Sequence, residues 1–122
     1  MQQQTFTLRQ LNLLVSEAIK TSLDGEYWVQ AELAECRESR GHCYMDLIEK
    51  DELSNTPIAR ASAKCWKNSW NLIRPNFERV TGQPLHAGLK VLLRVYAQFH
   101  EAFGFSWIVT DIDPTYTVGD LA

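Results

Sequence analysis

The sequence predicts a small, mainly β protein: a five-stranded Greek-key barrel with an added N-terminal helix and a short helix between strands 3 and 4. Three observations lead to this fold class. Apolar side chains in the first 24 residues recur with the spacing of a helix. From about residue 25 the apolar period changes to two, in five separate segments. Between the third and fourth of these segments, one stretch returns to helical spacing.

The predicted N-terminal helix follows Thr7, a residue type that often caps helices. Apolar residues then recur every three or four positions over Leu8–Ile19, with polar residues between them. Asp24–Gly25 ends the pattern. Residues 1–24 are therefore predicted to form an amphipathic helical extension that packs on the barrel.

The five alternating segments are predicted to be the strands of one domain that covers residues 25–114. In chain order they are residues 27–34, 42–49, 58–66, 89–100 and 105–113. Polar stretches at 35–41 and 50–57 are predicted to be loops. Some inward-facing residues are small, which suits a narrow barrel interior, namely Ala31, Ala59, Ala61 and Ala63.

The short helix between strands 3 and 4 is predicted over residues 67–74. Trp70 and Ile73 would share one side of it. Pro75 is expected to end it, because the residue before a proline disfavours helical backbone. At the other end of the chain, residues 115–122 are short and polar and are predicted to begin a linker.

The charge distribution carries more information than the net charge of −3, which by itself argues mildly against nucleic-acid binding. Residues 54–77 contain no Asp or Glu but four cations, Arg60, Lys64, Lys67 and Arg74. Phosphate contacts respond to the local field, so a mildly acidic domain can still carry one basic face. Composition alone leaves a basic binding face and an ordinary solvated surface equally open.

The three cysteines, Cys36, Cys43 and Cys65, lack the regular spacing of a disulfide framework and are predicted to be free thiols, with Cys65 facing the core. With His42 they also lack the short Cys spacing of a zinc site, so no metal or other cofactor is expected. No stretch approaches the roughly 20 apolar residues of a membrane span. The N-terminus lacks the pattern of a secretory signal, and we expect a cytoplasmic protein.

Five short strands with a helix between the third and fourth match the OB fold, a partly open Greek-key barrel. An open five-stranded sheet packed by two helices is the alternative. OB folds bind ligands across strands 2 and 3, flanked by the loops that join strands 1–2 and 4–5. The residues predicted to lie on this surface are Arg37, Arg40, His42, Tyr44, Arg60, Lys64, Trp66, His100 and Phe103.

This set combines cations with rings, which is how proteins hold single-stranded nucleic acid. We expect its arginines and lysine to neutralise phosphates, its Tyr, Trp and Phe to stack on bases, and its histidines to donate hydrogen bonds. The alternative for His42 and Tyr44 is cross-strand packing on an outer face, and Trp66 could pack beneath the helix that it begins. Trp28 and Trp107 are expected to be core or helix-packing residues.

Five motifs occur in order along nearly the whole chain. They are Thr7-Leu-Arg-Gln-Leu-Asn12, Tyr27-Trp-Val-Gln-Ala-Glu-Leu-Ala34, Gly41-His-Cys-Tyr-Met-Asp-Leu47, Lys64-Cys-Trp66, and Phe103-Gly-Phe-Ser-Trp-Ile-Val109 with Ile112-Asp-Pro114. In this order they resemble the N-terminal OB-fold domain of the exodeoxyribonuclease VII large subunit. The sequence departs from that family's pattern at Ala31, where a Gly is usual, at Glu35-Cys36, where an Asn-aromatic pair is usual, and in a longer loop at 50–57.

The resemblance implies a single-stranded-DNA-binding domain of an enzyme that degrades single-stranded DNA to oligonucleotides. In that family the nuclease core follows this domain, and the small subunits bind the large subunit outside it. Residues 115–122 would then lead toward the catalytic domain, and this chain alone would be inert. Asp111 and Asp113 share a strand face but are expected to be solvent-exposed charges rather than metal ligands.

Two other functions stay open. An anticodon-binding OB domain of a tRNA synthetase would use the same scaffold, although the N-terminal helix with its Leu11-Asn12 pair argues against it. A protein-interaction module built on an OB scaffold would bind no nucleic acid, and the net charge of −3 is its best support. Binding of an oligonucleotide separates this module from the nucleic-acid-binding functions.

Overall fold

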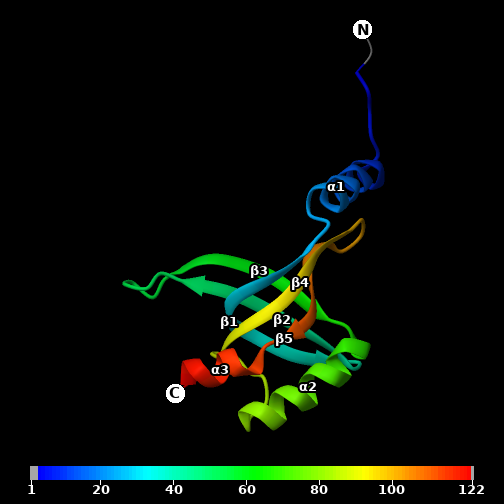
Figure 1. Cartoon of the computed structure of the whole chain (residues 1–122). Helices are drawn as coiled ribbons and strands as arrows, with labels where there is room; N and C mark the ends of the chain where they lie inside the picture. The colour runs from blue at the N-terminus through cyan, green and yellow to red at the C-terminus, as the bar shows by residue number, and fades with distance from the viewer. Residues whose placement is uncertain (1–2, 122) are drawn as a thin grey trace.

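The computed structural model describes residues 3–121, and Figure 1 shows the arrangement of their helices and strands. The elements follow in the order α1 (Leu8–Ser22), β1 (Glu26–Ser39), β2 (His42–Lys50), β3 (Pro57–Cys65), α2 (Lys67–Thr81), β4 (Lys90–His100), β5 (Gly104–Ile112) and α3 (Pro114–Leu121). The strands close into a barrel in the order β1-β2-β3-β5-β4. β3 and β5 run parallel, and the other neighbours run antiparallel. The five-stranded OB barrel predicted from the sequence is confirmed.

The core is built from the inward-facing side chains of the strands, because successive residues of a strand point to opposite faces. Leu33, Cys43, Val91 and Leu93 are fully buried there. Cys65 is also fully buried, as the sequence predicts. α2 covers one end of this core, the lower end in Figure 1, and contributes the buried side chains Trp70, Ile73 and Phe77.

α1 lies at the opposite end of the barrel, beside the β4–β5 turn (Figure 1). Thr7 caps it as predicted: its side chain accepts a hydrogen bond from the Gln10 backbone, and the Gln10 side chain accepts one from the Thr7 backbone. The Asn12 side chain donates a hydrogen bond of 2.9 Å to the Glu101 carbonyl in the turn. Most of the apolar face is not covered, however: Leu8 is 73% exposed and Leu14 is 53% exposed.

The prediction of a loop over residues 35–41 is wrong for residues 35–39, because β1 continues to Ser39. The turn to β2 consists only of Arg40 and Gly41, with φ angles of 55° and 85°. Positive φ at both central residues matches the twist of a tight hairpin. The alternation was hidden in the sequence because the pairing register shifts between Leu33 and Glu35, and such a bulge reverses which residues face inward.

The prediction that Pro75 ends the short helix is also wrong. α2 runs from Lys67 through Pro75 to Thr81. A proline inside a helix removes one backbone hydrogen bond. Beyond it, Phe77 is fully buried in the core, and burial of such a ring offsets part of that loss. The helix ends at Gly82, whose φ of 74° is the left-handed conformation common just past a helix end.

The segment predicted to begin a linker is helical as far as the structure describes it, since α3 covers Pro114–Leu121 and Ala122 lies outside the described residues. Asp113 accepts a hydrogen bond of 3.0 Å from the Thr115 backbone. Thr117 is fully buried and donates a hydrogen bond of 2.8 Å to the Lys90 carbonyl. The bond from Thr117 holds the segment against β4.

Within residues 3–121, no helix has the length and apolar character needed to cross a membrane.

Candidate nucleic-acid interface

One row of side chains crosses the outer face of three neighbouring strands. Arg37 on β1 lies opposite Tyr44 on β2, and Tyr44 lies opposite Lys64 on β3. Their chain neighbours Cys43 and Cys65 are fully buried, so the row itself faces outward. We call Arg37, Tyr44 and Lys64 the Tyr44 row. It lies on the strands 2 and 3 surface that OB folds use for ligands, with one cation on each side of a ring.

The row ends in an aromatic cluster. The Lys64 ammonium lies 5.7 Å from the centroid of the Trp66 ring and 5.9 Å from that of Phe103. Phe103 belongs to the β4–β5 turn, is 77% exposed, and stacks on His100 with centroids 4.6 Å apart and an interplanar angle of 27°. Lys64 therefore connects β3 with the β4–β5 turn, which brings together residues that lie about 40 positions apart in the sequence.

His42 and His100 each accept a hydrogen bond from a backbone N–H group at the edge of this surface. His42 Nδ1 accepts a hydrogen bond of 2.9 Å from the Lys67 backbone, and so caps the first turn of α2. Its ring also meets the Trp66 ring edge-on, with centroids 5.2 Å apart. His100 Nδ1 accepts a hydrogen bond of 3.0 Å from the Ala102 backbone. In each neutral ring the proton is then on Nε2, which is the nitrogen left to donate to a ligand.

Two predicted residues lie apart from the cluster. Arg40 is exposed in the β1–β2 turn. Arg60 shares the outer face of β3 with Lys64, but it pairs with Ile48 near the far end of the β2–β3 hairpin. The Tyr44 row and the aromatic cluster are thus brought together, whereas Arg60 would be reached only by a ligand that extends along β3.

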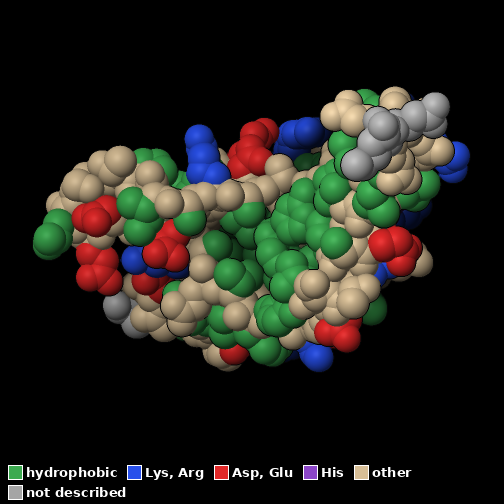
Figure 2. All heavy atoms as spheres, turned by 90° about the horizontal axis from the view of Figure 1, so that it is seen from above, with side chains coloured by type: hydrophobic (Ala, Val, Ile, Leu, Met, Phe, Trp, Pro, Cys, Tyr) green, Lys and Arg blue, Asp and Glu red, His purple; other side chains and the backbone are tan. Residues whose placement is uncertain are grey.

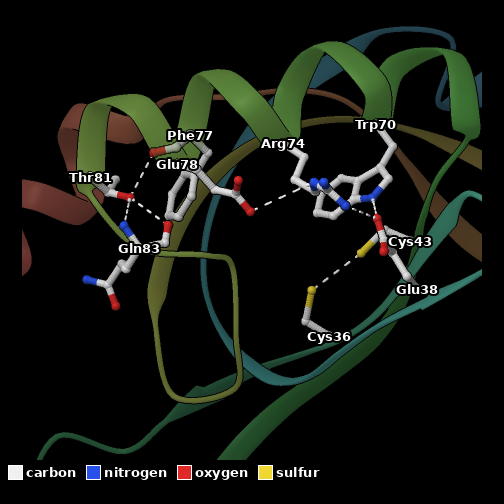
Figure 3. Close-up of polar contacts among 9 residues, drawn as sticks. All are labelled: Cys36, Glu38, Cys43, Trp70, Arg74, Phe77, Glu78, Thr81 and Gln83. Carbon is white, nitrogen blue, oxygen red and sulfur yellow. Dashed lines mark hydrogen bonds and ion pairs between the residues drawn. The ribbon is translucent and has the colours of Figure 1, made fainter.

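Part of the basic stretch at residues 54–77 is neutralised by an acid that precedes it. Arg74 forms an ion pair of 2.9 Å with Glu38 on β1, and Trp70 Nε1 also donates to the same carboxylate (Figure 3). The hydrogen bond from Trp70, followed by that from Arg74, holds the pKa of Glu38 below its ordinary value. Arg74 therefore stabilises the β1–α2 contact, whereas Lys64 and Arg60 form no ion pair with any acid of residues 3–121.

An apolar cleft that was not predicted from the sequence is lined by residues of all five strands. It has a volume of about 300 Å³ and is lined by residues that include Tyr27, Trp28, Ala59 and Trp107. Figure 2 shows a hollow on one face of the molecule with hydrophobic side chains gathered around it. The small side chains predicted to suit a narrow interior instead leave this cleft open, which was the available signal in the sequence.

The two tryptophans of this cleft differ. Trp28 is 50% exposed on the outside of β1, so its predicted place in the core or under a helix is wrong. Trp107 is half-buried and packs against the core, as predicted. It is held edge-on between Tyr27 and Phe105, with centroid distances of 6.3 Å and 5.2 Å.

Comparisons with known proteins agree with this geometry. Residues 6–113 match the family model described as OB-fold nucleic acid binding domain. The chain is 37% identical, over 98% of its length, to the exodeoxyribonuclease 7 large subunit of Deinococcus radiodurans, and it spans 30% of that protein. The resemblance drawn from the five motifs is therefore confirmed.

A solved structure, the dimeric N-terminal domain of the PriB protein from Thermoanaerobacter tencongensis, is 14% identical and covers 74% of this chain and 94% of its own, with a TM-score of 0.44. The family assignment rests on the matched residues 6–113 and on the barrel that they form. The chain belongs to the family of OB-fold nucleic acid binding domains.

Proposed function

We propose that this chain holds single-stranded DNA across the Tyr44 row, as the substrate-capturing domain of a larger enzyme of the exodeoxyribonuclease VII kind. The observation that carries the proposal is the continuity of the surface. Arg37, Tyr44 and Lys64 form one row over three strands, and the Lys64 ammonium lies within 6 Å of two further rings.

The chemistry of this surface suits an unpaired strand. Arg37 and Lys64 can each neutralise a phosphate, while Tyr44 and the exposed ring of Phe103 offer faces on which bases stack. Stacking on an aromatic side chain contributes about 1–3 kcal/mol per base and tolerates any sequence, because every base has a π-face. Duplex DNA hides those faces, so the surface should prefer the single strand.

The proposed enzyme is larger than this chain, which spans 30% of its Deinococcus relative. We infer that bond cleavage and the contacts with small subunits belong to the remaining parts of such a protein, which would act in the cytoplasm. Within residues 3–121, no group of three or more His, Cys, Asp or Glu side chains could hold a metal ion.

The experiment that tests the proposal is a titration of a fluorescently labelled oligo-dT of about 20 nucleotides, longer than a single OB-fold site of about 4–16. Anisotropy should show saturable binding that weakens as salt rises, with weaker binding of a duplex of equal length. Equal affinity for the duplex, or no binding at low salt, would contradict the proposal.

A protein-interaction module is the second candidate, and one observation favours it. The apolar side of α1 remains uncovered, with Leu8, Leu11 and Leu14 all more than 45% exposed. Large exposed apolar patches often mark interaction surfaces. The same titration separates the two candidates, because a module that binds only protein leaves the anisotropy of the oligonucleotide unchanged.

A further inference from the structure

Two thiols meet inside the barrel, next to the β1–β2 turn. The Cys36 and Cys43 sulfur atoms lie 3.3 Å apart, and Figure 3 shows them pointing toward one another. Cys36 pairs with Met45 and Cys43 pairs with Glu38, so the two cysteines are diagonal neighbours across the two strands. This contact takes no part in the proposed DNA-binding surface or in the β1–α2 contact.

The third cysteine does not share it. Cys65 lies directly opposite Cys43 in the β2–β3 register and is fully buried. Within the described residues, however, the sulfur–sulfur contact is between Cys36 and Cys43. The local geometry therefore selects one pair among three free thiols.

The two sulfur atoms of the pair are not equivalent. Cys36 is partly exposed, whereas Cys43 is fully buried, so a small solute from solvent reaches Cys36 first. The hydrogen bond between the two sulfur atoms lowers the pKa of Cys36 and raises the pKa of Cys43. Burial raises the pKa of Cys65 to about 12. Thiolates are the reactive form of cysteine, which makes Cys36 the more reactive thiol.

We propose that Cys36 and Cys43 are a peroxide-reactive pair that closes to a disulfide within the barrel. The Cys36 thiolate attacks the peroxide oxygen, so that the O–O bond breaks, Cys36 becomes a sulfenic acid, and the alcohol or water leaves with a proton. The Cys43 sulfur then attacks the Cys36 sulfur, the S–O bond breaks, and water leaves. Overall, two thiols and one peroxide give one disulfide, one water and one alcohol or second water.

The closure needs little movement. A disulfide is about 2.05 Å long, so the sulfur atoms approach by about 1.2 Å from their present separation. The bond ties β1 to β2 across a two-residue turn, beneath Arg37 and Tyr44, which are the chain neighbours of the two cysteines. The reaction itself does not depend on the proposed binding of DNA.

The test treats the purified chain with a stoichiometric amount of hydrogen peroxide, followed by thiol titration and peptide mass mapping. We expect two of the three thiols to be lost, a mass decrease of two hydrogen atoms, and a linked peptide pair that contains Cys36 and Cys43. Dithiothreitol should restore both thiols. A link that involves Cys65, a link between two chains, or no link under conditions that oxidise an unfolded control would overturn the proposal.

Single variants assign the two roles. Cys65→Ser is the matched control and should still form the disulfide at the rate of the unmodified protein. Cys43→Ser should accumulate a sulfenic acid at Cys36 that dimedone traps, and Cys36→Ser should consume peroxide at least tenfold more slowly. Circular dichroism verifies that each variant is folded. Cys43 is buried, so Cys43→Ser could fail to fold. In that case the rate of peroxide consumption by Cys36→Ser and the peptide map of the unmodified protein test the proposal. Equal rates in Cys36→Ser and the unmodified protein would contradict the first attack by Cys36.

Discussion

The guanidinium carbon of Arg37 lies 5.0 Å from the centroid of the Tyr44 ring, across the β1–β2 ladder. A cation at this distance from a ring face is attracted to it by about 0.5–1 kcal/mol at an exposed site. The contact holds one face of the ring beneath a positive charge before any ligand arrives. A DNA strand with a base stacked on Tyr44 would then find Arg37 already placed to pair with a neighbouring phosphate.

The first prediction concerns the Tyr44 ring. Tyr44→Ala should weaken binding of oligo-dT by about 5- to 150-fold, the equivalent of about 1–3 kcal/mol for one stacked base. The salt dependence should hardly change, because no charge is lost. Fluorescence anisotropy at several salt concentrations measures both quantities. Tyr44→Phe keeps the ring and should bind nearly as well as the unmodified chain, whereas unchanged affinity in Tyr44→Ala would return Tyr44 to a packing role.

The second prediction concerns the charge of Lys64. Lys64→Ala should weaken binding of all sequences alike and reduce the slope of log affinity against log salt by about 0.7, the value for one contact to a single-stranded phosphate. Arg79→Ala is the control, because Arg79 is an exposed cation near the end of α2 that contacts Asn76. If Lys64→Ala changed the preference among bases and left the slope intact, the phosphate assignment would be wrong.

The third prediction concerns the part of α2 beyond Pro75. Phe77 is fully buried there, so Phe77→Ala should lower the free energy of unfolding by about 3–5 kcal/mol. Leu72→Ala on the same helix should change it by no more than about 0.5 kcal/mol, because Leu72 is 77% exposed. Urea denaturation followed by circular dichroism measures both. Similar losses in the two variants would mean that the helix beyond the proline adds little to the core.

The fourth prediction concerns pH. The pKa of Glu38 is lowered from its ordinary value of 4.5, chiefly by the hydrogen bond from Trp70 and then by Arg74. A carboxyl group with a lowered pKa in the folded state stabilises that state above its unfolded pKa, and the stabilisation is lost as the pH falls through the folded pKa. The difference in unfolding free energy between the unmodified chain and Glu38→Gln should therefore be full at pH 7 and shrink below about pH 4.5.

The measurement is urea unfolding at a series of pH values from 7 to 3. Glu17→Gln is the control, since Glu17 forms only an exposed pair of 3.8 Å with Lys20 on α1, and such pairs contribute little. A difference between the unmodified chain and Glu38→Gln that stays constant over the whole series would show that the Glu38 charge does not support the β1–α2 contact.

The elements that could be predicted from the sequence are those with an unbroken period. The alternation of Cys43, Met45 and Leu47 identifies the inner face of β2, and all three side chains are buried. The helix cap at Thr7 is a local feature, so it can be predicted without any tertiary contact; the reciprocal bond to the Gln10 side chain appears only in the structure. The course of α2 beyond Pro75 was not visible, because the burial of Phe77 that supports it is a tertiary contact.

The candidate site divides in the same way. The pairing of Tyr44 with Lys64 follows from strand order and alternation, because residues on paired strands that face the same way become neighbours. Arg37 was predicted to lie in a loop, and its place opposite Tyr44 depends on the bulge in β1. The separation of Arg60 from the aromatic cluster and the pairing of Arg74 with Glu38 depend on how β3 and α2 cross the barrel, which no periodicity records. The exposure of Trp28 depends likewise on what covers the outer face of β1, and no helix of the described residues buries this side chain.

The bulge at Ala34 changes which residues of β1 face the core. Before it, odd-numbered residues such as Leu33 point inward; after it, Cys36 points inward and Arg37 points to solvent. If Ala34 were paired as an ordinary strand residue, without the bulge, the composition of the strand would be unchanged, yet the guanidinium of Arg37 would point toward the core and the thiol of Cys36 toward water. The way in which this one residue is paired, rather than which residues are present, therefore decides what chemistry the second half of β1 presents to a ligand.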